Sequence, residues 1–285
     1  MLANATLIPF FLGIFTNVSN FDPEYVFEMN KVTITYKPQI ETAGFSSSIT
    51  CHPFQMDNLR CFVHDIKHVI STDQISEKSN RIKVGQWFEM KFTDTRGIQD
   101  VLIIEKRPKK LIKNFMKDII HQFNIGPVGD IENVNNTHEF KKYDLMGEEK
   151  TPIGKCISTY LTQIGKYKMD GHKETNSSFQ IGLLKDRFDQ KDLYVYIKKY
   201  RNNCIYSSHF AHFLGKGKVT SYLHTITVRQ NKLQMYTSLN GYRPIYSGGI
   251  AETFYFSQIT DIQLINIIPQ KTISFKDYNA IKFDY

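Results

Sequence analysis

The pair His209 and His212 is the arrangement in this sequence that most resembles a metal-binding motif. The two residues stand three positions apart in the segment SSHFAHFLGKGK. A zinc site in a protein needs three or four protein ligands, and no third ligand accompanies this pair. We therefore expect no metal ion at these histidines.

Other reactive residue types lack the patterns that catalysis requires. The segment Gly215-Lys216-Gly217 has neither the spaced glycine nor the Lys-Ser/Thr pair of a phosphate-binding loop. No Gly-x-Ser-x-Gly motif occurs to present a nucleophilic serine. Asp94, Asp100 and Glu105 surround a predicted turn, where we expect solvated carboxylates. The sequence therefore predicts that the protein is not an enzyme and that it holds no cofactor.

Four cysteines are better explained as disulfide partners than as nucleophiles. Cys51 and Cys61 flank a predicted chain reversal, which favours a hairpin disulfide, with two free buried thiols as the alternative. Cys156 and Cys204 are the other two. A bridge between them would join two strands that are distant in sequence. An even number of cysteines is typical of a protein that matures in an oxidising compartment.

Two clusters of basic residues are the best candidates for a binding function. The first comprises Lys106, Arg107, Lys109, Lys110 and Lys113, and the second comprises Lys198, Lys199 and Arg201. The formal charge of the whole chain is +8. Each cluster is either an ordinary solvated face or an electropositive patch that docks onto an acidic partner.

The first residues predict secretion. Residues 1–19 contain no charge and carry the apolar run LIPFFLGIF, which is too short to span a bilayer and resembles the core of a signal peptide. Sequons at Asn135 and Asn176 lie in polar surroundings that suit glycosylation. We expect residues 20–285 to form one domain, secreted to the extracellular space.

Residues 109–124, KKLIKNFMKDIIHQFN, predict an amphipathic helix. Apolar residues recur with helical period, and lysines and other polar residues occupy the opposite side. Almost all of the surrounding chain is rich in β-branched and aromatic residues, as strands are. One amphipathic helix among strands predicts a curved sheet that is wrapped on the helix.

Strands are predicted over about residues 25–36, in the two cysteine-bearing segments that follow, in a hairpin over residues 86–105, and through most of residues 154–268. The polar stretch TDQISEKSNR, residues 72–81, predicts a loop. So does the charged and Asn-rich stretch over residues 126–151.

These segments, in this order, resemble the N-terminal domain of vitellogenin in the large lipid transfer protein family. The resemblance is carried by FTDTRGIQDVLIIEK followed by LIKNFMKDIIHQF, then by GEEKTPIGKC, then by YRNNC. It implies a mainly β fold, a large antiparallel β-barrel of the N-sheet type that is filled by one central helix. It also implies that Cys156 pairs with Cys204.

The resemblance further implies a function in lipid transport or yolk nutrition. The chain ends at Tyr285, before the helical and lipid-cavity domains of the family. We therefore expect lipid to be bound only with other domains or chains, and the module to act by recognising a lipoprotein-type receptor through the first basic cluster.

A cationic secreted protein that binds anionic surfaces or nucleic acid is the alternative. The segment YVYIKKYR interleaves tyrosines with basic residues that could stack on bases. One such strand is weak support, and no specific nucleic acid is expected.

Overall fold

The computed structural model describes residues 5–7, 12–15, 23–36, 40–54, 58–72, 75–93, 97–104, 108–126, 141–166, 180–183, 193–229, 232–247, 250–269 and 280–283. Its helices are α1 (Lys110–Phe123) and α2 (Ser208–Leu214). Its strands are β1 (Ala5–Leu7), β2 (Leu12–Phe15), β3 (Pro23–Tyr36), β4 (Glu41–Phe54), β5 (Asn58–Val63), β6 (Ile66–Thr72), β7 (Ile75–Ile82), β8 (Gln86–Phe92), β9 (Ile98–Ile104), β10 (Lys141–Thr151), β11 (Gly154–Lys166), β12 (Gln180–Leu183), β13 (Leu193–Tyr206), β14 (Lys218–Arg229), β15 (Lys232–Ser247), β16 (Ile250–Pro269) and β17 (Ala280–Lys282).

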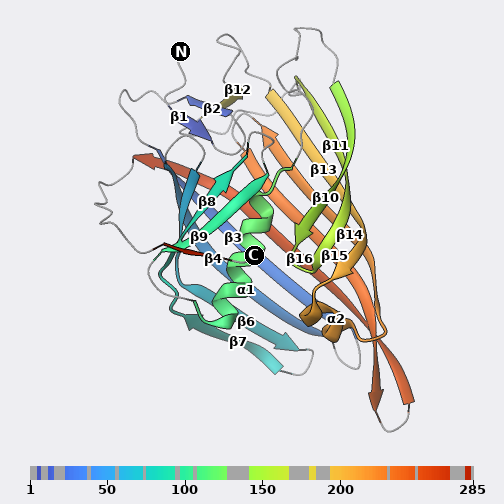
Figure 1. The fold of residues 1–285 in the computed structure, drawn as a ribbon. Helices are drawn as coiled ribbons and strands as arrows, with labels where there is room; N and C mark the ends of the chain where they lie inside the picture. Colours follow the sequence, from blue (N-terminus) through green and yellow to red (C-terminus); the bar gives the residue numbers. More distant parts are fainter. Residues whose placement is uncertain are drawn as a thin grey trace, which may run out of the picture.

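One antiparallel sheet of 14 strands dominates the described part of the chain. Its strand order is β10-β11-β13-β14-β15-β16-β3-β4-β5-β8-β9-β17, and the β6–β7 hairpin branches from β4. The sheet curves around α1 (Figure 1). The predicted fold class, a large antiparallel sheet wrapped on a central helix, is therefore confirmed. In the described residues the sheet is not closed into a barrel, because β10 and β17, at the two ends of its strand order, do not pair with each other.

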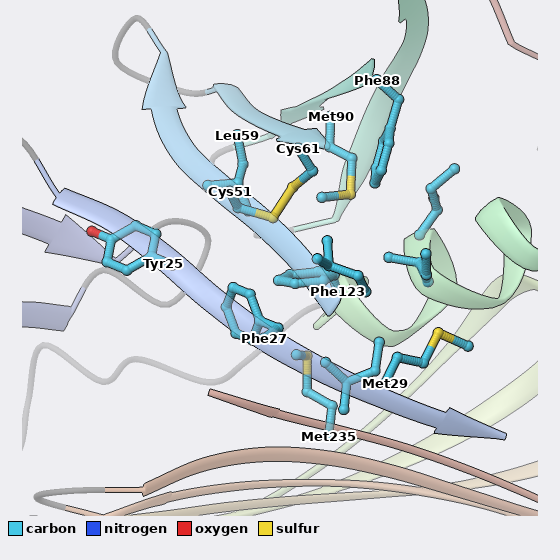
Figure 2. Close-up of a cluster of buried hydrophobic side chains, with 14 of the residues drawn as sticks. Tyr25, Phe27, Met29, Cys51, Leu59, Cys61, Phe88, Met90, Phe123 and Met235 are labelled. Carbon is cyan, nitrogen blue, oxygen red and sulfur yellow. A yellow bond between two sulfur atoms is a disulfide. The ribbon is translucent and has the colours of Figure 1, made fainter. Parts of the chain in front are cut away.

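Helix α1 fills the concave side of the sheet, and it begins and ends within a residue of the predicted bounds. Its apolar stripe, which includes Phe115, Met116, Ile120 and Phe123, is buried in one core with residues of both halves of the sheet. The Phe123 ring meets Phe27 of β3 edge to face at 5.2 Å. Figure 2 shows this core, with side chains from β3, β5, β8 and β15 gathered around the helix.

Two disulfides join the pairs that the sequence suggested. Cys51 and Cys61 stand opposite each other in the β4–β5 register. Cys156 and Cys204 join β11 to β13 across a sequence separation of 48. The first bridge lies inside the apolar core (Figure 2), and the second belongs to a smaller cluster with Leu214 of α2.

Two segments that were predicted to be loops are strands, and both predictions were wrong for the same reason. The polar stretch after residue 72 contains β7, and the charged stretch before residue 151 contains β10. Each strand lies at an edge of the sheet and pairs on one side with a neighbour, β6 or β11. Backbone pairing at an edge needs no apolar side chains, so the composition of these strands does not reveal them.

The N-terminal segment also contains strands. β1 and β2 form a separate three-stranded sheet with β12. Removal of residues 1–19 as a signal peptide stays a prediction.

Candidate functional site

The first basic cluster lies at the start of α1. Lys109 and Lys110 are exposed, and Lys113 is half-buried, with its ammonium 5.4 Å from the centre of the Phe283 ring. Lys106 and Arg107 lie outside the described residues, as do the predicted glycosylation sites Asn135 and Asn176.

Lysines at a helix start oppose the usual electrostatic preference. The amino end of a helix carries about half a positive charge, which favours acidic side chains in the first turn. The first turn of α1 has no acidic residue and no side-chain cap. The lysines and the helix dipole therefore add to one positive potential, at a cost in helix stability that packing of the apolar stripe must offset.

The second basic cluster is divided by the alternation of β13. Lys198 faces outward, whereas Lys199 and Arg201 face inward and are buried, at 0% and 4% exposure. The interpretation of all three as one basic surface was therefore wrong. The sequence carries a signal for this division. Lys199 and Arg201 continue the alternating series that begins with the apolar Val195 and Ile197, so the period of two places them on the buried face.

A polar cluster at the far end of α1 receives the two buried cations. Lys199 donates to Oε1 of Glu149 on β10 at 2.8 Å. Arg201 donates to both carboxylate oxygens at 3.0 Å, and Ser158 of β11 donates to Oε2 at 2.7 Å. Asn124, just after α1, adds a contact at 3.3 Å. We call these five residues the helix-end node.

The helix-end node also satisfies the end of α1 and links strands near the two ends of the open sheet. Lys199 donates to the backbone carbonyl of Asn124, so its charge lies at the negative end of the helix dipole. The Asn124 side chain accepts from the backbone N–H of Ile98 on β9 at 3.4 Å, while its amide donates to Glu149 on β10. A single residue thus bridges strands from opposite ends of the sheet order.

A second polar chain runs from α1 to the sheet beside the node. Gln122 bonds the Thr237 hydroxyl of β15, and that hydroxyl lies 2.8 Å from Nδ1 of His224 on β14. Nε2 of His224 is buried and has no hydrogen-bond partner among the described residues. Burial, followed by the charge of Arg201, lowers the pKa of His121 to about 3 and that of His224 well below its ordinary value.

The electrostatics of the node favour a fixed ion pair over acid–base chemistry. Burial alone would raise the pKa of the Glu149 carboxyl, but Arg201 and Lys199 outweigh it and hold the pKa well below the usual range. Burial lowers the pKa of Lys199 to about 8, against the opposing effect of Glu149. A carboxylate whose pKa lies so far below neutral pH is a poor general base, and its ion pairs suit a structural role.

Metal binding finds no support in the described residues. His209 and His212 are exposed on α2, and no group of three or more potential ligands is assembled there or elsewhere in the described part of the chain. None of the helices in that part is long and apolar enough to cross a membrane.

Comparison with known proteins gives a match by structure alone. The sequence matches no known family and no characterised protein. A solved structure of lipovitellin, titled for its lipid–protein interactions, superposes over 90% of this chain with a TM-score of 0.52 and 11% sequence identity. The fold is vitellogenin-like. The chain spans about a quarter of the lipovitellin chain, 26%. The resemblance seen in the sequence is thereby confirmed at the level of the fold.

Proposed function

We propose that this chain acts outside the cell as a recognition module of the lipid-transport type, which binds a partner through its surface and does not hold lipid by itself. The vitellogenin-like fold supports the lipid-transport context, and the two disulfides fit an oxidising compartment. The partner we propose is a lipoprotein-type receptor with acidic ligand-binding modules.

The filled interior is the observation that carries this proposal. The concave side of the sheet is occupied by α1, and Phe115, Ile119 and Phe123 are buried there together with apolar side chains of the strands. An interior that is packed by the protein's own helix leaves the surface as the means of recognition.

The start of α1 supports a docking role for the first basic cluster. Lys109 and Lys110 project into solvent at the positive end of the helix dipole. Positive charge at the end of a helix whose first turn has no acidic residue forms a surface that attracts acidic modules. Lys106 and Arg107 precede these lysines directly in the sequence and belong to the same proposed surface.

Receptor binding by a charge-reversal variant tests the proposal. The quadruple variant Lys106→Glu, Arg107→Glu, Lys109→Glu and Lys110→Glu should weaken binding to an immobilised ectodomain of acidic, calcium-loaded repeats by at least about tenfold. Binding of the unmodified protein should weaken as salt rises, because exposed charge pairs are screened.

A matched control separates the site from net charge. The pair Lys109→Glu and Lys110→Glu changes the charge as much as Lys67→Glu and Lys83→Glu, which are exposed in and after the β6–β7 hairpin. Only the first pair should weaken receptor binding. Equal losses, or unchanged binding by the quadruple variant, would overturn the proposed surface. Phospholipid that reproducibly co-purifies with the monomer would overturn the proposed mode of action.

A further inference from the structure

Four neighbouring strands concentrate the positive charge of the chain. β11, β13, β14 and β15 are adjacent in the sheet and lie side by side in Figure 1. Within their bounds they contain nine Lys or Arg residues and no Asp or Glu. These strands alone can account for the formal charge of +8. Only part of this charge is consumed by the helix-end node.

The outward face of the middle strands also carries a row of tyrosines. Alternation along β13 places Tyr194, Tyr196, Lys198 and Tyr200 outward, while the residues between them are buried. The Tyr194 and Tyr196 rings are parallel within 10° at a centroid distance of 6.2 Å. The Tyr200 side chain, 42% exposed, lies 4.7 Å from the Lys198 ammonium.

Cations from the next two strands complete this face. Arg229 stands opposite Tyr194 in the β13–β14 register, 5.7 Å from its ring, and Lys232 stands opposite Arg229. Both are exposed. The rows between them and Tyr200 carry hydroxyl and amide groups, among them those of Thr227 and Gln234. We call Tyr194, Tyr196, Lys198, Tyr200, Arg229 and Lys232 the tyrosine platform.

We propose that the tyrosine platform binds a sulfated polysaccharide. The cations would pair with sulfate and carboxylate groups, and the phenol rings would stack on the apolar faces of the sugar rings. The neighbouring hydroxyl and amide groups supply the hydrogen bonds that sugar hydroxyls require. Asp261 of β16, which stands across β15 from this face, is engaged by Gln234 at 2.8 Å and by Gln263 at 2.7 Å.

The surroundings of the tyrosine platform favour a polysaccharide over a nucleic acid. Two disulfides belong to a protein that matures in an oxidising compartment, where the common anionic polymer is sulfated glycan. Hydroxyl and amide rows between the cations suit a ligand that presents many hydroxyls along its length. This inference is independent of the receptor surface at the start of α1.

Affinity for a size-defined heparin oligosaccharide tests the platform. We expect the full chain to bind it at about 0.15 M salt. The variant Lys198→Gln, Arg229→Gln and Lys232→Gln should bind at least about tenfold more weakly, and its plot of log affinity against log salt should lose about three units of slope, one for each lost ionic contact.

A second variant isolates the aromatic contribution. Tyr196→Ser combined with Tyr200→Ser should weaken binding by about five- to tenfold and leave the salt slope unchanged, because it removes stacking and keeps every charge. The thermal unfolding midpoint of each variant, measured alongside, should stay near that of the parent, because these side chains face outward.

Three outcomes would overturn the inference. The first is that the full chain does not bind the oligosaccharide. The second is that Lys67→Gln, Lys83→Gln and Lys91→Gln, which are exposed outside the platform and cause the same loss of charge, weaken binding as much as the platform variant. The third is that oligo(dT) of matched charge binds more tightly and displaces the oligosaccharide, which would assign the platform to single-stranded nucleic acid.

Discussion

Lys198 and Lys199 are neighbours on β13, and their ammonium groups lie in opposite environments. Lys199 is fully buried, bonded to Glu149 and to the end of α1. Lys198 lies on the outward face beside Tyr200, on a stretch of sheet without carboxylates. On the inner face of β13, Lys199 is neutralised by a buried carboxylate, whereas on the outer face Lys198 lies at the surface beside a tyrosine ring.

This difference separates two uses of the same residue type. A buried cation needs a partner, because its loss of hydration is large, and such a pair then fixes the geometry of whatever it joins. An exposed cation contributes little to stability and remains free to attract a ligand. The comparison therefore predicts that substitutions on the inner face change stability and that those on the outer face change binding.

Glu149 and Glu148 offer the strongest test, because they are adjacent on β10 and face opposite ways. The Glu149 side chain is 2% exposed and that of Glu148 is 54% exposed. Glu149→Gln leaves two buried cations without their carboxylate and should lower the free energy of unfolding by about 3–5 kcal/mol. Glu148→Gln loses an exposed pair with Lys155 and should cost less than about 1 kcal/mol. Urea denaturation measures both, and similar costs would contradict the comparison.

The two disulfides should contribute different amounts to the free energy of unfolding, and the bridge that closes the longer loop should contribute more. Replacing Cys156 and Cys204 by Ala should lower the free energy of unfolding by about 4 kcal/mol in the chain-entropy model, because the bridge closes a long loop. Replacing Cys51 and Cys61 by Ala should lower it by about 3 kcal/mol, because its loop is short. Denaturation of both variants without reductant checks the order, and a reversed order would show that core packing around Cys51 outweighs loop closure.

Mild acid should lower the free energy of unfolding, because two buried histidines resist protonation in the folded protein. The pKa of His121 is about 3 in the folded protein, and that of His224 lies well below its ordinary 6.5. The unfolded chain therefore binds protons below pH 6.5 that the folded chain refuses, so stability falls as pH falls. Between pH 7.5 and 5.5 the two residues together should cost about 2–3 kcal/mol.

Denaturation at both pH values compares the parent with His121→Gln combined with His224→Gln. The double variant should lose correspondingly less stability on acidification. His209→Gln, at an exposed position of α2, should retain the full dependence of the parent. An unchanged pH dependence in the double variant would refute the assignment.

Substitutions on the outer face should have the smallest effect on the free energy of unfolding. Lys198→Gln and Lys232→Gln remove charges that have no carboxylate partner on their own strands. Each should change the free energy of unfolding by less than about 0.5 kcal/mol. Thermal unfolding measures this, and a loss comparable to that of Glu149→Gln would mean that the outer charges stabilise the sheet.

Much of the fold could be predicted from local sequence patterns, whereas the helix-end node could not be predicted from them. The stripe of Phe115, Ile119 and Phe123 has helical period, and the alternation along β13 has a period of two, so both are visible in the sequence. Glu149 lies in a charged segment that reads as a loop, and its partners Lys199 and Arg201 are some fifty positions away. Their contact depends on the pairing of β10 with β11 and of β11 with β13, which no local pattern reports.

The sequence by itself determined helix α1, its apolar face, most of the strands of the large sheet and the excess of positive charge, because each follows from the order of residues along a few turns or strands. Tertiary structure alone decided which charges are neutralised. Strand order brings Glu149 within reach of two cations and of Asn124. It also makes neighbours of β11, β13, β14 and β15, four strands that contain no carboxylate. The physical reason is that electrostatic energy depends on distance and burial, and both are set by which strands become neighbours.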